Sequence, residues 1–556
     1  MNLKACSLRR PAPPGPAPWS RLAADCSLDP SLARLAWMRG CDTPEELAWR
    51  LDPAWSRTSD PYAVEGIGSA VAALREAVAA GRRICVYGDY DVDGVTATAL
   101  MVRVLERIGA KPAFFIPNRF SDGYGLNLEC IRELKANSDP GLIVSVDCGI
   151  RSVTEVEASR GLGIDWIITD HHSLGPDLPA ARAVVHPGLG GYANPHLSGV
   201  GVAFKLAQAL LDVRRPGGED AAFLDGLLKL VAIGTIADMV PLRGENALLV
   251  RRGLLALRAS NGPGLSALLA AAKSGGAPKA MDIAFGIGPR LNAVGRMGGA
   301  EDAVRLLLTR DAKDASVLMA RVEQLNSDRK AVQQDLQKSL SPPGKEGFDL
   351  VVEPAAHKGV IGIVAGQRMR ESGRPTAVCT VLDGVAQCSM RAPEGYDLGE
   401  LLELARPYLL SGGGHRLAAG MSFHLSKLDF VRRTLVQGAE TQGSQRPGGA
   451  TLVDALGSAD IPTAEQLESL EPWGQGFPWP VAALQGRLAR VPEVFGGSHA
   501  RLRLEGLPEP LTWFSAGDLS HRYSKGQPLA FAAAPQDHPR WGRSWVVEAP
   551  LEPREG

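Results

Sequence analysis

Short apolar runs, each followed by a turn and a segment with helical spacing, dominate the chain from about residue 81 to residue 187. They are ICVYG at 84–88, AFFIP at 113–117, LIVSVD at 142–147, WIITD at 166–170 and AVVHP at 183–187. Continuous runs rich in β-branched residues that alternate with helices are typical of parallel strands covered on both faces. The sequence therefore predicts an α/β domain built on a parallel sheet.

The rest of the chain predicts further domains. A helical pattern follows the sheet, and a charged helical stretch at 301–341 ends at SPPGKEG. A second α/β unit and a polar linker come next, and short alternating runs near the C-terminus predict a small β-barrel. The first 20 residues are rich in proline and are expected to be disordered. The predicted parts are an N-terminal arm at 1–40, partly disordered, a first α/β domain at 41–300, a connecting helix at 301–341, a second α/β domain at 348–437 and a β-barrel at 451–552.

Composition limits the environment of this protein of 556 residues. No apolar run reaches the roughly 18 residues that span a bilayer, and the first residues lack the apolar core of a secretory signal, so we expect a cytoplasmic protein. The eight cysteines contain no CxxC pair, which predicts reduced thiols rather than disulfides or a zinc site. Because the net charge is −1, any nucleic-acid contact must use local positive charge.

Acidic residues and histidines follow several of the predicted strands. The carboxyl ends of neighbouring parallel strands border one crevice, so these side chains are expected to converge there. A further acid lies in the apolar helical segment GTIADMVP, where an unpaired charge is costly. The residues are Asp89, Asp91, Asp93, Asp147, Asp170, His171, His172 and Asp238.

So many carboxylates in one crevice repel one another unless cations neutralise them. Oxygen donors suit Mg²⁺ or Mn²⁺, and an imidazole favours Mn²⁺. The ligands outnumber those that one small ion takes from protein alone, so we expect two divalent ions and phosphodiester hydrolysis. A single Asp at a strand end is usually a helix N-cap, but capping explains neither the DxDxD triplet nor the paired histidines. The first turn also lacks the GxGxxG of a dinucleotide site.

The motifs resemble those of a known family. YGDYDVDGVTATAL, SVDCGI, TDHH and GTIADMVPL occur in the order of the phosphoesterase motifs of the DHH superfamily. PNRFSDGYGL, GIGPRLNAVGRM, GVIGIVAGQRM and GGGHRLAAG extend the resemblance to the RecJ exonucleases, over about residues 81–552. The resemblance implies a DHH catalytic domain, a DHH-associated domain that grips nucleic acid, and a C-terminal OB-fold.

The resemblance also implies roles for the clustered residues. Asp170 would orient His171, and His172 would contact the scissile phosphate or its leaving oxygen. Tyr87 stands where many superfamily members have a metal-binding His, so one ion would be held mainly by Asp89, Asp91 and Asp147. The implied metal ligands are Asp89, Asp91, Asp93, Asp147, His171 and Asp238.

A second group of residues points to anion binding. Consecutive glycines turn backbone N–H groups toward an anion, and guanidinium groups recognise a terminal phosphate, although a Gly-rich turn or a loop Arg often has no such role. Aromatic residues interleaved with cations near the C-terminus could stack on bases, or they could form the barrel core. The candidate phosphate and nucleic-acid contacts are Arg119, Arg290, Arg296, Ser389, Arg391, Gly413, Gly414 and His415.

The function implied by the resemblance is 5′→3′ hydrolysis of single-stranded DNA to mononucleotides in repair and recombination. The implied partners are single-stranded DNA, a single-stranded-DNA-binding protein and a recombination helicase, with the chain acting as a monomer. Two alternatives stay open: a phosphoesterase for oligoribonucleotides or cyclic dinucleotides, and a DNA-binding scaffold without catalysis. The barrel argues against the first alternative, and the intact acidic cluster argues against the second.

Overall fold

The computed structural model describes residues 6–12, 16–123, 125–213, 217–273, 277–444, 451–458, 460–496, 498–514, 516–538 and 542–553. The chain forms two compact units. The first contains residues 1–115, 125–288 and 449–556, and the second contains residues 116–124 and 289–448.

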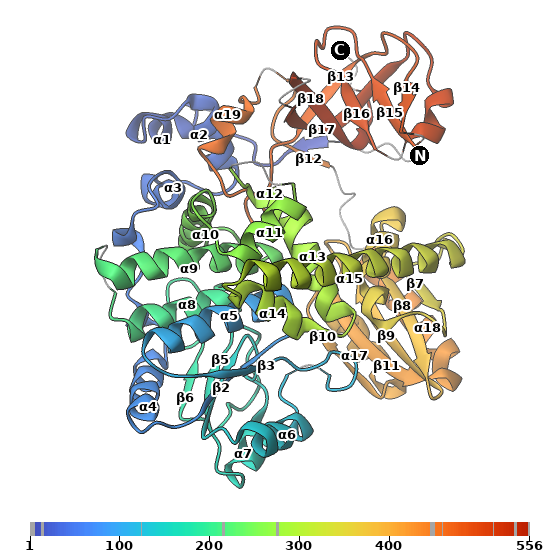
Figure 1. The fold of residues 1–556 in the computed structure, drawn as a ribbon. Helices are drawn as coiled ribbons and strands as arrows, with labels where there is room; N and C mark the ends of the chain where they lie inside the picture. The colour runs from blue at the N-terminus through green and yellow to red at the C-terminus, as the bar shows by residue number, and fades with distance from the viewer. Residues whose placement is uncertain are drawn as a thin grey trace. The chain divides into compact units, whose positions relative to one another are not determined.

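A five-stranded sheet is the centre of the first unit (Figure 1). All its neighbouring strands pair in parallel, in the order β3-β2-β4-β5-β6, which confirms the predicted parallel sheet. The strands β2 to β5 begin at the runs that the sequence analysis identified. Their bounds are β2 Ile84–Gly88, β3 Ala113–Phe115, β4 Leu142–Val146, β5 Asp165–Thr169 and β6 Ala183–Val185.

Helices cover both faces of this sheet. On one face, apolar side chains of α6 and α7 pack against Tyr87, Trp166 and their neighbours in a continuous core. Helices α4, α5 and α8 contact the strands too, and α9 and α10 pack outside them. The helices are α4 Ile67–Ala79, α5 Val92–Arg107, α6 Leu128–Ser138, α7 Val153–Arg160, α8 Gly199–Leu210, α9 Gly218–Ala237, α10 Gly244–Leu257, α11 Pro263–Ala271 and α12 Ala280–Asp282.

The N-terminal segment is more ordered than predicted. Strand β1 (Cys6–Leu8) pairs with β12 (Thr451–Val453), so the disorder expected for the first 20 residues is wrong for this strand. Helices α1 (Trp19–Asp25), α2 (Pro30–Met38) and α3 (Pro44–Leu51) share a core with residues that precede the C-terminal sheet. In that core, Leu35 and Leu47 pack with residues of the segment that starts in α19 (Ala464–Glu468). These residues are Leu467, Leu470, Trp473 and Phe477.

The C-terminal sheet has six strands in the order β13-β17-β18-β16-β15-β14. Trp513, Phe531 and Trp545 lie in its core, which agrees with the expectation that the aromatic residues of this region form the barrel core. Phe514 is exposed. Two other residues of that pattern, Arg540 and Trp541, lie outside the described residues. The strands are β13 Ala482–Arg487, β14 Glu493–Phe495, β15 His499–Leu502, β16 Leu511–Trp513, β17 Pro528–His538 and β18 Gly542–Leu551.

The second unit holds a mixed sheet in the order β10-β11-β9-β8-β7, with α17 and α18 packed against its core. The strands are β7 Asp349–Val352, β8 Thr376–Leu382, β9 Val385–Arg391, β10 Ser411–Gly414 and β11 Ala418–His424. The helices are α13 Gly288–Arg296, which starts in the first unit, α14 Ala300–Leu308, α15 Ala312–Ser339, α16 Lys358–Ser372, α17 Leu398–Ala405 and α18 Leu428–Ser444.

Three sequence expectations for this unit need correction. The connecting helix predicted at 301–341 is two helices, because Asp311 caps α15 by accepting the N–H groups of Lys313 and Asp314. Helix α18 extends to Ser444, into the predicted linker. Cys379 and Cys388 form a disulfide, so the expectation of reduced thiols is wrong for this pair. The antiparallel register of β8 and β9 places the two residues directly opposite each other.

Among the described residues, no helix is both long enough and apolar enough to cross a membrane.

Candidate metal centre and anion-binding residues

Three buried carboxylates follow adjacent strands of the parallel sheet. Asp89 follows β2, Asp147 follows β4 and Asp170 follows β5. Strand β4 pairs with both β2 and β5, so the three acids share one edge of the sheet. All three are at most 2% exposed, which is unusual for carboxylates.

The other two acids of the DxDxD triplet lie at the start of α5. Asp91 is the N-cap, and its Oδ1 accepts the N–H groups of Asp93 and Gly94 at 2.9 and 3.1 Å. The capping interpretation is therefore correct for one oxygen of Asp91, and the second oxygen is not used by that cap. Asp93 accepts the N–H groups of Gly199 and Val200, at 2.6 and 2.8 Å, from the N-terminus of α8.

The N-terminus of α8 approaches the cluster closely because residue 199 is glycine. A Cβ at Gly199 would lie 2.3 Å from Oδ1 of Asp147, so any larger residue would collide with this carboxylate. Two backbone N–H groups at the positive end of a helix stabilise the charge of Asp93. The sequence analysis missed this anchor; the glycine-containing run SGVGVAF that opens α8 was its only signal.

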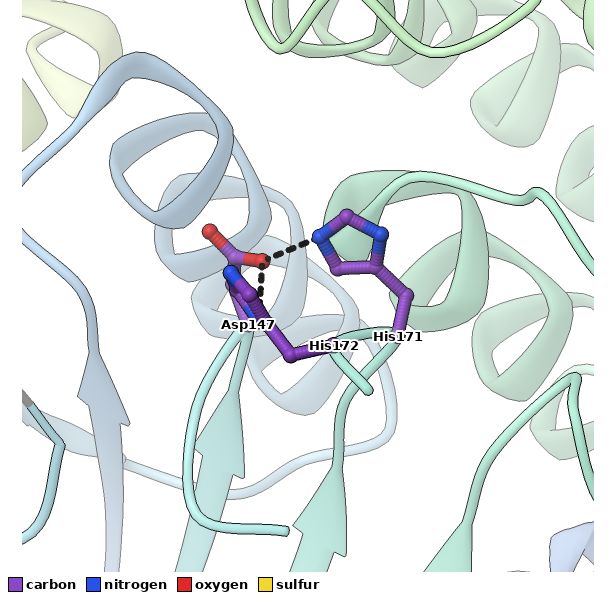
Figure 2. A group of neighbouring side chains, drawn as sticks. All are labelled: Asp147, His171 and His172. Atoms are coloured by element: carbon purple, nitrogen blue, oxygen red, sulfur yellow. Dashed lines mark ion pairs between the residues drawn. The ribbon is translucent and has the colours of Figure 1, made fainter. Parts of the chain in front are cut away.

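His171 lies between three of the carboxylates. Its Nε2 is 3.1 Å from Oδ1 of Asp147, 3.7 Å from Oδ2 of Asp238 and 3.8 Å from Oδ2 of Asp93. Asp238 enters the cluster as the C-cap of α9. Figure 2 shows the ring of His171 directed at Asp147, with His172 on the same side of that carboxylate.

Burial and mutual repulsion change the protonation of these groups. Burial, and then the charges of neighbouring carboxylates, raise the pKa values of Asp93, Asp147 and Asp238. Burial lowers the pKa of His171 to about 3, so its ring is neutral and can ligate a metal ion. The acids therefore lack a compensating cation from His171.

The donor set fits divalent cations. Oδ1 of Asp147 and Nε2 of His171 are buried without a hydrogen-bond partner among the described residues, although they lie 3.1 Å apart. A cation contacting both atoms would satisfy both. The described part of the structure contains three groups in which the possible ligand atoms all lie within 4.8 Å of one another. They are Asp89, Asp91 and Asp147; Asp93, His171 and Asp238; and Asp147, His171 and His172.

Asp170 orients His172 rather than the ring of His171. Its Oδ1 lies 2.8 Å from Nδ1 of His172 and also accepts the backbone N–H groups of both histidines. Burial would raise the pKa of Asp170, but the hydrogen bonds from His172 and Ile150 lower it to about 2. Burial would lower the pKa of His172, but its bond to Asp170 and the nearby carboxylates raise it to about 9. His172 is therefore a cation at neutral pH.

In the second unit, Arg119, Ser389 and Arg391 come together. Arg391 donates to the hydroxyl of Ser389 at 3.2 Å and to the carbonyl of Met390 at 2.7 Å. Burial, and then the charge of Arg119, lower the pKa of Arg391. No carboxylate pairs with Arg391 in the described part of the chain.

Two other predicted arginines are held by protein groups. Arg290 and Arg296 were expected in loops, but both lie on α13. Arg290 forms an ion pair with Glu323 of α15, and Arg296 donates to the carbonyl of Gly359 at 3.0 Å. Their side chains are thus positioned by the second unit itself.

The glycine run forms a strand instead of a loop that encloses an anion. Gly412, Gly413 and Gly414 belong to β10, an edge strand paired with β11, and the N–H of His415 donates to the carbonyl of Ala418. Gly413, Gly414 and His415 are exposed. They therefore offer an open strand edge rather than a closed pocket.

Comparisons with known proteins place these domains in a family. Residues 83–235 match the model of the DHH family N-terminal domain, residues 347–440 match the DHHA1 domain, and residues 455–544 match the RecJ OB domain. The single-stranded-DNA-specific exonuclease RecJ of Thermus thermophilus is 36% identical over 91% of this chain and 72% of its own length. The chain belongs to the RecJ family.

Other RecJ proteins agree with this assignment. RecJ of Bacillus subtilis is 35% identical over 87% of this chain, and the aligned region spans 62% of that protein. The crystal structure of Thermus thermophilus RecJ with Mn²⁺ superposes with a TM-score of 0.83, at 30% identity, over 98% of this chain and 79% of that one. Its Mg²⁺ complex gives a TM-score of 0.76, at 28% identity, over 98% and 78%. Both crystal structures hold a divalent ion of the kind that the ligand set of this chain predicts.

Tyr87 stands where many members of the DHH superfamily are expected to have a metal-binding His. Its side chain does not belong to the carboxylate groups, because it is buried in the core beside Phe115 and Trp166. Its hydroxyl donates to the carbonyl of Gly125 at 3.3 Å. The group formed by Asp89, Asp91 and Asp147 therefore receives no ligand from position 87.

Proposed function

We propose that this RecJ-family exonuclease hydrolyses single-stranded DNA from the 5′ end and releases mononucleotides, using two divalent ions, Mn²⁺ or Mg²⁺. The observation that supports this most strongly is the convergence of buried carboxylates and a neutral histidine at one edge of the parallel sheet. Buried carboxylates with raised pKa values release their protons to bind metal ions, and adjacent divalent ions suit phosphodiester chemistry.

The chain offers two neighbouring sets of ligands. Asp89, Asp91 and Asp147 would hold one ion, and Asp93, His171 and Asp238 the other. Asp147 also lies next to His171, so its carboxylate is placed to serve both sets. When bound, the ions supply positive charge for the phosphate and acidify water.

The remaining residues of this site orient groups and supply charge. Asp170 fixes the ring of His172 at Nδ1 and keeps it protonated. The Nε2 of His172 can therefore donate to a phosphate oxygen or protonate the departing 3′ oxygen, and this is the role that we propose for His172.

For the recognition of the 5′ end, we assign Arg119, Ser389 and Arg391. A terminal phosphate carries more charge than an internal diester, so the guanidinium group of Arg391, which has no carboxylate partner among the described residues, favours it. Arg290, Arg296, Gly413, Gly414 and His415 remain proposed contacts to the strand outside this trio.

The test is digestion of oligonucleotides labelled at either end, as single-stranded DNA, duplex DNA and single-stranded RNA, with Mn²⁺ or Mg²⁺. The proposal expects mononucleotides to be released first from the 5′ label of single-stranded DNA. Cleavage limited to dinucleotides or cyclic dinucleotides would instead favour a small-substrate phosphoesterase, and binding without cleavage would favour a scaffold.

Cellular context is the last part of the proposal. We assign the chain to the cytoplasm, as a monomer that acts in DNA repair and recombination beside a single-stranded-DNA-binding protein and a recombination helicase. Its support is the family membership, because RecJ relatives are single-stranded-DNA-specific exonucleases. Sedimentation of the purified chain, alone and with each partner, tests these assignments.

A further inference from the structure

His186 contacts the catalytic loop from outside. It follows β6 and is 4% exposed, and neither the metal groups nor the sequence motifs assigned it a role. Its Nε2 lies 2.8 Å from the backbone carbonyl oxygen of His172. On the other side of the ring, Nδ1 accepts the N–H of Gly188 at 3.0 Å.

These two contacts determine the state of the ring. A backbone carbonyl can only accept, so Nε2 of His186 must carry the proton that it donates to His172. A backbone N–H can only donate, so Nδ1 must be unprotonated to accept from Gly188. The ring is therefore neutral with its proton on Nε2, and both of its nitrogens are used.

The segment 170–172 is thus held from two sides. Asp170 binds the backbone N–H groups of both histidines and the Nδ1 of His172, which fixes the amide side. His186 fixes the carbonyl side of His172. Asp170 and His186 are themselves buried, so removing either one takes a protein partner from a polar backbone group of this segment.

We propose that His186 is a positioning residue for hydrolysis: by holding the carbonyl of His172, it keeps the ring of His172 in its working orientation. Its ring forms no hydrogen bond with a ligand side chain among the described residues. This inference rests on the proposed function, because it concerns the same hydrolytic site. An error of about 1 Å in such a group can cost on the order of 100-fold in rate.

Three substitutions separate the two contacts of the ring. An Asn side chain reaches the position of Nδ1 and a Gln side chain the position of Nε2. His186→Asn therefore keeps the bond from Gly188, His186→Gln keeps the bond to His172, and His186→Ala loses both. Ser159→Ala is the control, because Ser159 is equally buried, binds the indole N–H of Trp166 at 2.6 Å and contacts no residue of the loop.

The measurements are kcat and KM on single-stranded DNA at saturating Mn²⁺, Mn²⁺ affinity, and thermal unfolding. We expect kcat to fall about ten- to a hundredfold in His186→Asn and His186→Ala, with KM and Mn²⁺ affinity within about threefold of the parent. His186→Gln should keep kcat within about threefold of the parent, and Ser159→Ala should lose stability but not kcat. If His186→Ala does not fold, the comparison of Asn with Gln carries the test alone.

Hydrogen exchange of residues 168–174 provides a second measurement that does not depend on activity. Exchange should accelerate in His186→Asn and remain at the parent rate in His186→Gln and Ser159→Ala. An inactive parent would contradict the proposed function but would leave this exchange pattern intact. Parent-like kcat and exchange in folded His186→Asn, or a His186→Gln variant as impaired as His186→Ala, would overturn the role of His186.

Discussion

Nε2 of His171 and Oδ1 of Asp147 lie 3.1 Å apart, yet neither atom has a hydrogen-bond partner among the described residues. The pKa of His171 is lowered to about 3, so its ring is neutral at neutral pH and has one nitrogen lone pair for a metal ion. A neutral nitrogen and a carboxylate oxygen at this separation are ligands prepared for the same cation.

Metal binding should be linked to pH. The pKa values of Asp93 and Asp238 are raised to about 7 and about 9, by burial first and then by neighbouring carboxylates. The folded, metal-free chain therefore binds protons more tightly than the unfolded chain, and its stability falls as pH rises from about 4 through this range. Mn²⁺ competes with these protons, so the rise in melting temperature with Mn²⁺ should be larger at about pH 8 than at about pH 5.5.

Thermal unfolding with and without Mn²⁺ at both pH values checks this. Asp238→Ala removes one ligand and one raised pKa, so its Mn²⁺-dependent shift should be smaller and less sensitive to pH. Equal shifts at the two pH values in the parent would contradict the proton linkage.

His172→Ala should slow hydrolysis and leave metal binding nearly intact. Its ring is held by Asp170 at Nδ1, and it stands beside the ligand groups as a cation. A positioned acid or charged donor of this kind contributes on the order of 10²–10⁴-fold to a rate. Rates at saturating Mn²⁺, together with the metal content of the purified variant, measure both effects, and a variant that loses its ions would move His172 among the ligands.

Arg391→Ala should reduce the preference for a 5′-phosphate. The charge of Arg119 acts on Arg391, which has no carboxylate partner among the described residues, so a charge-assisted contact of about 1.5–3 kcal/mol to a terminal phosphate predicts a loss of roughly ten- to a hundredfold. The comparison is the rate on 5′-phosphorylated and 5′-hydroxyl strands. Arg305→Ala is the control, because Arg305 pairs with Glu301 on the surface of α14. An unchanged preference in Arg391→Ala would remove this residue from the site.

Truncation should show that the N-terminal helices need the residues before the C-terminal sheet. Leu467, Leu470, Trp473 and Phe477 bury their side chains among α1 to α3, at about 2 kcal/mol each. A chain that ends near residue 449 should therefore melt well below one that ends near residue 481. The chain that ends near residue 481 should still cleave single-stranded DNA but should bind long single strands poorly. Similar melting temperatures for the two truncations would contradict the shared core.

The sequence was sufficient where one local pattern controls one feature. Runs such as LIVSV predicted the strands of the parallel sheet, and acids that follow these runs had to meet at one edge. The DxDxD triplet also predicted correctly that Asp91 and Asp93 lie beside Asp89 and Asp147, although Asp91 is an N-cap as well.

Contacts between distant segments could not be predicted in this way. The bond between His172 and Asp170 replaced the expected one to His171, because ring directions depend on the bend of the loop after β5. The pairing of β1 with β12 and the buried ion pair of Arg39 with Asp454 join segments more than 400 residues apart. No periodicity or motif in either segment indicates its partner.

The most direct test of the account is a substitution that removes a metal ligand and leaves the fold intact. Asp91→Asn retains an oxygen that can cap α5, so its stability without metal should match the parent, whereas Asp91→Ala should lose about 1 kcal/mol. The measurement is the release of mononucleotides from 5′-labelled single-stranded DNA in excess Mn²⁺, with thermal unfolding beside it. The account predicts that folded Asp91→Asn is essentially inactive. Hydrolysis above about a tenth of the parent rate, a loss of less than about 1.4 kcal/mol in transition-state stabilisation, would contradict the assignment of this cluster as the catalytic metal centre.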